Sequence, residues 1–227
     1  MSPEFDKYAN EYSKLLADPL RDRFANESFF HERKFLLMRE YFSLHGWEPE
    51  GRTWIDIGCG RGELLKLGRA DFGVATGCDV SPEMLGGCAG LEVRRQLKDD
   101  VLPFTDGFAD LATAVCVYHH VPPPKRAALT REALRILKPG GYFCIIEHNP
   151  LNPLTQAIVK RSPVDVDAQL LRARETCRLL EDQHLRIEAL QYFLFFPAFL
   201  FRTAGFMETA FTRLPLGGQY AVFARVP

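Results

Sequence analysis

The 227-residue sequence lacks several features that would assign a protein to a class directly. None of its six cysteines stands in a C-x-x-C pair, which argues against a structural zinc site. Several lie in apolar runs, such as Cys116 in Ala-Val-Cys-Val, and are interpreted as small buried hydrophobes in a reducing compartment. No cluster of His, Cys and Asp has the spacing of metal ligands, so we predict no bound metal.

The sequence also has no long apolar run, and we expect no signal peptide. The aromatic run 192–201 contains Pro197 and is too short for a bilayer span, which takes about 20 residues. The first residues, Met-Ser-Pro-Glu-Phe-Asp-Lys, have neither the basic nor the apolar region of a signal peptide. We therefore expect a cytoplasmic protein without a membrane span.

Neither positive nor negative charge is in excess in this sequence. The 28 basic and 29 acidic residues give a net charge of -1, and no basic block stands out. This balance disfavours a nucleic-acid partner. Apolar residues make up 47% of the chain, which is enough to bury a sizeable core.

The chain does contain an alternation of short apolar runs with helical stretches. The first 45 residues have helical spacing, and helices are predicted at 63–69, from Ser81 onward, and at 126–137 and 173–183. Strands are predicted at 53–57, 74–79, 91–97, 111–118, 142–147, 187–196 and 219–225. Such alternation indicates a parallel sheet covered on both faces, and the two close C-terminal strands allow an antiparallel finish.

The most informative segment is Trp54-Ile-Asp56-Ile-Gly58-Cys59-Gly60-Arg61-Gly62-Glu63. A strand feeds a glycine-rich turn that opens a helix, and ligands of open α/β sheets bind at this end of the strands. The spacing is G-x-G-x-G rather than the G-x-G-x-x-G of dinucleotide-binding folds. Asp79 ends the next strand, where a carboxylate can accept hydrogen bonds from two ribose hydroxyls.

A family resemblance follows from five segments taken in order. They are Asp56-Ile-Gly-Cys-Gly-Arg-Gly62, Asp79, the stretch 99–110, His119-His120, and Arg135-Ile-Leu-Lys-Pro-Gly-Gly141. As a set, they resemble the class I S-adenosylmethionine-dependent methyltransferases, of the small-molecule, methyltransferase-domain 11 type, over residues 50–148. The resemblance implies a three-layer, doubly wound α/β sandwich. Its seven-stranded sheet would be mostly parallel with an antiparallel last strand, and N-terminal helices would be added.

The resemblance also implies an organisation and an activity. Residues 1–48 would form a helical cap, and residues 49–227 the methyltransferase domain, which includes a proline-containing insertion at 149–172. The enzyme would move a methyl group from S-adenosylmethionine to a small-molecule acceptor by in-line displacement, with or without a general base. We expect a monomer or a homodimer.

The family pattern assigns cofactor residues position by position. Asp56 and the glycine turn would line the methionine and ribose portions, and Asp79 would hold the ribose. Asp99 or Asp100 would face the adenine amino group. Tyr12 would lie on a leading helix that closes over the cofactor, or in an aromatic stripe packed on the sheet. The full expected set is Tyr12, Asp56, Gly58, Cys59, Gly60, Gly62, Asp79, Val80, Asp99, Asp100, Val101, Val117 and Tyr118; Arg61 is expected to point to solvent.

The acceptor would lie beyond the fourth and fifth strands. The candidate catalytic residues there are His119, His120, Glu147 and His148. A histidine has a suitable pKa for base catalysis near neutrality, but these side chains could equally orient the loop or pack beside the cofactor. We also expect Glu147-His148-Asn149-Pro150 to face the acceptor. The run 192–201 is interpreted as a core strand and helix, or as a dimer surface or the wall of an apolar pocket.

Two other functions compete. One is an NAD(P)-dependent oxidoreductase on a related fold, which the glycine spacing and the Lys138-Pro-Gly-Gly141 turn disfavour. The other is a non-catalytic regulatory protein that binds S-adenosylmethionine. A nucleic-acid acceptor is disfavoured because the Asn-Pro-Pro-Tyr signature of base methylation is absent, and Asn149-Pro150-Leu151 does not match it. The methylated atom is left open.

Overall fold

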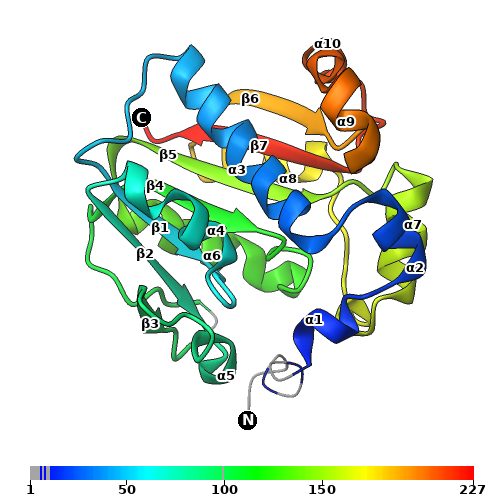
Figure 1. The fold of residues 1–227 in the computed structure, drawn as a ribbon. Helices are drawn as coiled ribbons and strands as arrows, with labels where there is room; N and C mark the ends of the chain where they lie inside the picture. The colour runs from blue at the N-terminus through cyan, green and yellow to red at the C-terminus, as the bar shows by residue number, and fades with distance from the viewer. Residues whose placement is uncertain (1–5, 7, 9–10, 99) are drawn as a thin grey trace.

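A seven-stranded sheet forms the centre of the molecule (Figure 1). The computed structural model describes residues 6, 8, 11–98 and 100–227. The strand order is β3-β2-β1-β4-β5-β7-β6, and β7 pairs antiparallel with both of its neighbours while the other pairs are parallel. The strands are β1 Thr53–Ile57, β2 Val74–Asp79, β3 Glu92–Arg95, β4 Ala109–Val115, β5 Leu137–His148, β6 Arg186–Phe193 and β7 Gln219–Arg225. The predicted fold class is confirmed.

Helices cover both faces of this sheet. The helices described are α1 Tyr12–Leu15, α2 Pro19–Phe24, α3 Glu27–Leu44, α4 Glu63–Gly68, α5 Pro82–Leu85, α6 Pro123–Ile136, α7 Pro153–Arg161, α8 Ala173–Glu181, α9 Ala198–Ala204 and α10 Glu208–Phe211. Short 3₁₀ turns are η2 Arg69–Asp71, η3 Pro163–Asp165 and η4 Gly205–Met207. No helix in the described ranges combines the length and apolar character needed to cross a membrane.

The alternation of side chains along each strand produces the three layers. Trp54 packs with α3 and α4 on one face, whereas the adjacent Ile55 packs with α6 on the other. On the first face, the Tyr41 ring of α3 stacks on Phe223 of β7 with 3.7 Å between centroids. The predicted boundary between a helical cap at residues 1–48 and the domain at residues 49–227 stays a prediction. Helix α3, within the first of these segments, packs directly on the sheet.

Local capping sets where several helices begin. The Asp18 carboxylate accepts the backbone N–H groups of Leu20 and Arg21, and Pro19 is the first residue of α2. Ser81 caps α5 in the same way, as the sequence predicts. Asn152 caps α7, so the insertion at 149–172 contains a regular helix and η3.

Three predicted strand ends are wrong by three residues or more, and backbone geometry explains two of them. Strand β4 ends at Val115 because Cys116 adopts a left-handed φ of 57°. Strand β6 ends at Phe193 because Leu194 has a φ of 62°, and the second half of the aromatic run forms α9 instead. Strand β5 begins at Leu137, so the Lys138-Pro-Gly-Gly141 segment lies inside it.

Candidate active-site cavity

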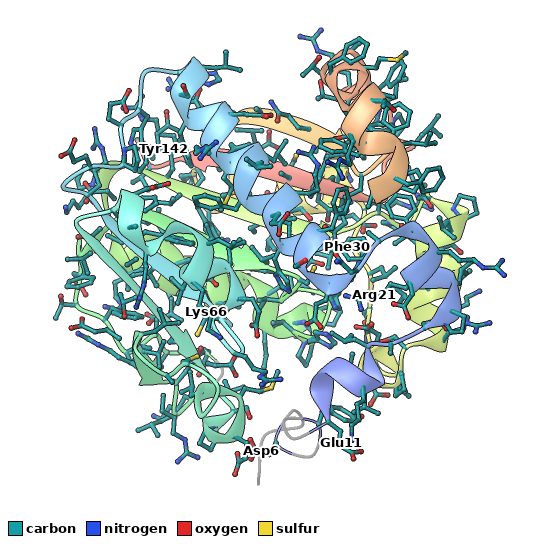
Figure 2. All side chains as sticks on the ribbon, viewed as in Figure 1. Asp6, Glu11, Arg21, Phe30, Lys66 and Tyr142 are labelled. Carbon is teal, nitrogen blue, oxygen red and sulfur yellow. The ribbon has the colours of Figure 1, made fainter. Side chains whose placement is uncertain are left out.

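A cavity of about 640 Å³ lies at the carboxyl ends of β1, β2, β4 and β5. The glycine turn after β1 and the end of β2 form one wall. Residues of α1, α2, α3 and α7 form the opposite wall. Arg21 of α2 and Phe30 of α3, both labelled in Figure 2, line it, with the Arg21 guanidinium 5.0 Å from the Phe30 ring centroid. This is the position at which open α/β sheets bind their ligands.

The glycine turn brings backbone to the cavity wall. Gly58 has a φ of 68°, and a Cβ added there would lie 2.6 Å from Cγ2 of Val117. Gly60 is open, since the nearest atom to an added Cβ is Cε of Met84 at 3.8 Å. Gly62 is the N-cap of α4 and does not line the cavity; a Cβ there would meet Leu91 at 2.4 Å. Gly58 and Gly60 therefore shape the ligand wall, whereas Gly62 allows close packing behind it.

Asp79 is held in a fixed orientation beside this turn. Its Oδ2 accepts the backbone N–H of Gly60 at 2.8 Å, and its Oδ1 accepts that of Ser81 at 2.9 Å. Burial raises the pKa of this carboxyl, and the two backbone N–H groups act against that rise. Both oxygens keep lone pairs for further donors, so the side chain suits a pair of hydroxyl groups on a ligand.

Asp56 is the second carboxylate of this wall. The register of β1 and β4 places Thr113 opposite it, and the Thr113 hydroxyl donates to Oδ1 at 2.6 Å. Burial raises the pKa of Asp56 to about 7, against the effect of this hydrogen bond. A ligand ammonium group would favour the charged form of such a buried carboxyl.

The N-terminal segment lies across this end of the cavity. The Ser81 hydroxyl donates to Asp6 at 2.6 Å, and Leu15 and Leu16 line the cavity. On the far side, Arg161 of α7 donates to Asp18 at 2.7 Å, which joins α7 to the start of α2. The side chain of Tyr12 falls outside the part of the chain that the structure describes, as does Asp99.

A buried His–Glu pair lies where β4 and β5 end. His119 Nδ1 is 2.5 Å from Glu147 Oε2, and the other Glu147 oxygen accepts the Tyr118 backbone N–H at 2.7 Å. Burial disfavours a charged ring, but Glu147 and Asp165 outweigh it and raise the pKa of His119 to about 10. Glu147 is fully buried and does not line the cavity, so the expectation that it faces the acceptor is wrong.

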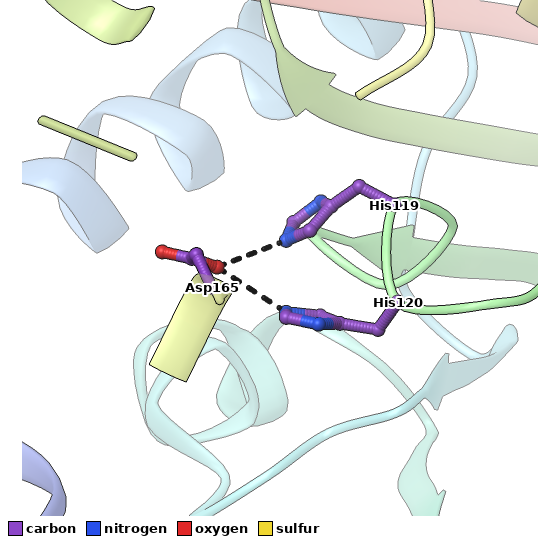
Figure 3. A group of neighbouring side chains, drawn as sticks. All are labelled: His119, His120 and Asp165. Atoms are coloured by element: carbon purple, nitrogen blue, oxygen red, sulfur yellow. Dashed lines mark ion pairs between the residues drawn. The ribbon is translucent and has the colours of Figure 1, made fainter. Parts of the chain in front are cut away.

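His119 and His120 converge on one carboxylate, as Figure 3 shows. Oδ1 of Asp165 lies 3.4 Å from Nε2 of each histidine. All three residues line the cavity. The sequence did not point to this group, because Asp165 lies 45 residues after His120, in the insertion.

A second polar cluster surrounds Cys116. Lys34 Nζ donates to its Sγ at 3.6 Å and Gln219 Nε2 at 3.5 Å, and Gln219 also lies 3.3 Å from His148 Nδ1. Burial would raise the pKa of the thiol, but the charges of Lys34 and His148 lower it to about 7. Lys34 is buried and lies on α3, a position that helical periodicity alone did not mark.

The expected site residues separate into two groups. Those that line the cavity are Asp56, Gly58, Cys59, Gly60, Asp79, Val80, Val117, His119, His120 and His148. Tyr118 does not, because the chain turns at Cys116 and its fully buried hydroxyl bonds to Thr130 of α6 at 3.0 Å. Asp100 and Val101 are exposed, and Gln96 and Leu97 occupy the wall beside Val80 instead.

Two further expectations are corrected. Arg61 lines the cavity rather than facing only solvent. Asn149 is buried and donates to the carbonyl oxygens of Pro215 and Gly217, so it does not face an acceptor. In the aromatic run, Leu194 lines the cavity, while Phe199 on α9 is 69% exposed.

Comparison with known proteins agrees with this architecture. Residues 55–145 match the family model described as "Methyltransferase domain". A tRNA (carboxymethyluridine(34)-5-O)-methyltransferase of Arabidopsis thaliana is 27% identical over 165 residues, which cover 72% of this chain and 38% of that protein. A 2-methyl-6-phytyl-1,4-hydroquinone methyltransferase of Synechocystis is 32% identical over 108 residues, covering 44% of this chain and 33% of that protein.

Among solved structures, the fold is similar to a SAM-dependent methyltransferase of Thermotoga maritima, described as a possible histamine N-methyltransferase. The TM-score is 0.68 at 20% identity, and 98% of each chain is covered. A putative methyltransferase in complex with the Haloferax volcanii Trm112 activator gives a TM-score of 0.67 at 23% identity, over 100% of this chain and 99% of that one. The chain spans well under half the length of the Arabidopsis and Synechocystis relatives.

Proposed function

We propose that this chain, a class I S-adenosylmethionine-dependent methyltransferase by its matched domain and its fold, methylates a small molecule with an apolar body. The family and its cofactor, S-adenosylmethionine, were predicted from the sequence and are confirmed. The acceptor, the roles of individual residues, the cytoplasmic location and the oligomeric state are proposals. The observation that carries the proposed acceptor is that one cavity joins a polar, cofactor-type wall to an apolar one.

The polar wall fits the cofactor in charge and in shape. Asp79 would accept the two ribose hydroxyls, and Val80 and Gln96 would flank the adenine. Asp56 would attract the ammonium of the methionine portion, and the open backbone at Gly60 would let the ligand lie close. When bound, S-adenosylmethionine supplies an electrophilic methyl group on a sulfonium; the chain supplies position and charge.

The apolar wall fits the acceptor. It consists of Leu15, Leu16, Phe24, Phe30, Leu154 and Ile158, with Lys34, Cys116, His120 and His148 at its inner end. Such a surface favours a molecule that buries an apolar body and presents one ionisable group to the methyl donor. We assign to His148 the role of taking the acceptor's proton, and to the His119–Glu147 pair the role of holding the loop in place.

A second candidate acceptor is a modified tRNA base. The Arabidopsis relative carries that activity in its name, and its alignment covers 72% of this chain. Lys34 and His148, at the inner end of the cavity, could receive an acidic acceptor group. Against this, the sequence has neither an excess of positive charge nor a basic block.

The test uses S-adenosylmethionine with a labelled methyl group. The purified chain would be offered phenols, amines and carboxylic acids with apolar bodies, and, in a separate arm, tRNA that contains carboxymethyluridine. We expect label in at least one small molecule and none in the tRNA. Label in the tRNA alone would replace the proposed acceptor with the second one, and failure to bind S-adenosylmethionine in calorimetry would reject both.

A further inference from the structure

We propose, against the expectation from the sequence of no bound metal, that His119, His120 and Asp165 form a divalent metal site with a two-nitrogen, one-oxygen donor set at this end of the cavity. The three side chains come from two segments, the loop after β4 and the turn η3, and point to a common position (Figure 3). Their ligand atoms all lie within 4.8 Å of one another.

The distances between these ion-paired side chains also fit a shared metal ion. Oδ1 of Asp165 lies 3.4 Å from Nε2 of both His119 and His120, which is longer than the roughly 2.7–3.2 Å of an ordinary N–H···O hydrogen bond. Zinc binds imidazole nitrogen and carboxylate oxygen at about 2.0–2.2 Å, so ligand atoms at the corners of a tetrahedron are about 3.4 Å apart. The carboxylate oxygen already has this separation from both nitrogens.

An independent observation is the support behind His119. Nδ1 of its ring is 2.5 Å from Glu147, which leaves Nε2 to point at Asp165. Both side chains are 1% exposed, and the backbone N–H of Tyr118 fixes the Glu147 carboxylate. Metal-binding histidines are commonly oriented in this way, by a carboxylate at the nitrogen that does not touch the metal.

The donor set restricts the choice of ion. Two imidazoles and one carboxylate suit zinc and the neighbouring transition metals, whereas magnesium and calcium prefer oxygen donors. Three protein ligands leave a coordination position open, and all three residues line the cavity, so this position faces the acceptor. If the proposed function holds, an acceptor hydroxyl at that position would lose its proton more readily.

The site is testable without turnover, so its failure is distinct from failure of the proposed acceptor. The full chain would be stripped with a chelator and titrated calorimetrically with Zn²⁺, and with Co²⁺ followed by visible absorption. We expect one ion per chain and a cobalt spectrum of nitrogen and oxygen ligation. His120→Ala and Asp165→Asn should each weaken binding at least tenfold, and Glu147→Gln by about 10–100-fold, the usual effect of losing the supporting carboxylate.

Two matched controls use neighbouring side chains. His148→Ala removes a histidine whose ring lies 5.2 Å from that of His119, and Cys116→Ser removes the thiol that could bind zinc nearby. Both should keep the metal affinity of the wild type. Unchanged affinity in Asp165→Asn and His120→Ala, or a thiolate band in the cobalt spectrum that Cys116→Ser abolishes, would overturn the proposal. Retained binding of S-adenosylmethionine, together with an unchanged melting temperature, shows that each variant is folded.

Discussion

The backbone N–H of Gly60 donates a 2.8 Å hydrogen bond to Oδ2 of Asp79, which joins the glycine turn after β1 to the end of β2. A second backbone N–H, from Ser81, holds the other carboxylate oxygen. Two local interactions therefore fix this carboxylate before any ligand arrives. Such preorganisation reduces the cost of ordering the site on binding.

Removal of this carboxylate should weaken cofactor binding strongly. Asp79→Ala deletes a charged acceptor for two ribose hydroxyls, which we expect to cost roughly 1.5–3 kcal/mol, or about 10–150-fold in affinity for S-adenosylmethionine. Titration calorimetry measures the change. The matched control is Asp71→Ala, at an exposed residue of η2, which should bind S-adenosylmethionine with the wild-type affinity. Equal affinities in the two variants would remove Asp79 from the site.

Cofactor binding should release a proton from Asp56. Its pKa of about 7 in the unliganded chain means that the carboxyl is largely protonated at pH 6. A bound ammonium favours the charged form and lowers this pKa, so affinity should rise with pH from about 5.5 to 7 and then level off. Calorimetry in buffers of different ionisation enthalpy counts the protons released.

Two variants isolate this effect. Asp56→Asn should flatten the pH dependence and weaken binding at pH 7.5. Thr113→Val removes the hydroxyl that stabilises the carboxylate, so it should raise the pKa and move the profile to higher pH. A profile that is the same in all three proteins would show that another group titrates.

The part of the site that the sequence predicts is the part built by local chain geometry. The turn from Asp56 to Gly60 depends on neighbouring residues and on the strand-to-helix pattern, and both are visible in the sequence. Asp165 was missed because its contact with His120 depends on how the insertion folds back. Tyr118 was misplaced because the left-handed conformation of Cys116, which has no sequence signature, ends β4 early.

Cys116 should be the most reactive of the cysteines toward an alkylating reagent at pH 7. A pKa of about 7 makes roughly half of it thiolate, whereas Cys177 has a raised pKa. Lys34→Met removes the nearest cation and should slow alkylation at Cys116 more than tenfold. Peptide mass spectrometry after timed reaction with iodoacetamide gives the rate at each site. An unchanged rate in Lys34→Met, at unchanged melting temperature, would contradict the assignment.

The buried ion pair between Arg33 and Glu208 should contribute to stability as a unit. Glu208 also accepts the Phe195 backbone N–H at 2.8 Å, and the Arg33 guanidinium lies 3.9 Å from the Phe201 ring centroid. Glu208→Ala leaves a buried guanidinium unpaired and should lower the free energy of unfolding by about 3–5 kcal/mol. Denaturant unfolding measures this.

The double variant Arg33→Met, Glu208→Leu distinguishes the net contribution of the ion pair from the cost of leaving one buried charge unpaired. It removes both charges and should lose less stability than Glu208→Ala alone. The exposed Glu40→Ala on α3 should change the free energy of unfolding by less than about 0.5 kcal/mol. If Glu208→Ala and Glu40→Ala change the free energy of unfolding by the same amount, the ion pair does not contribute to stability.

Replacement of His148 should separate turnover from cofactor binding. The side chain lines the cavity at the end of β5, whereas Asp56 and Asp79 lie on β1 and β2, so we expect His148→Ala to keep the wild-type affinity for S-adenosylmethionine. If it removes the acceptor's proton, its loss should lower kcat by about 10²–10⁴-fold. The assay requires an acceptor from the labelled-methyl screen and single-turnover kinetics, which report the chemical step directly.

The His119–Glu147 pair should respond differently, because it acts by holding the loop after β4. Glu147→Gln keeps the shape of the side chain but loses the charge beside His119, and should change KM together with kcat as His119 and His120 lose their fixed positions. A fall in kcat alone for Glu147→Gln, with His148→Ala near normal, would move the role of base from His148 to the buried pair. If both variants keep normal kcat and KM, the enzyme works by aligning its substrates, and neither residue has a catalytic or positioning role.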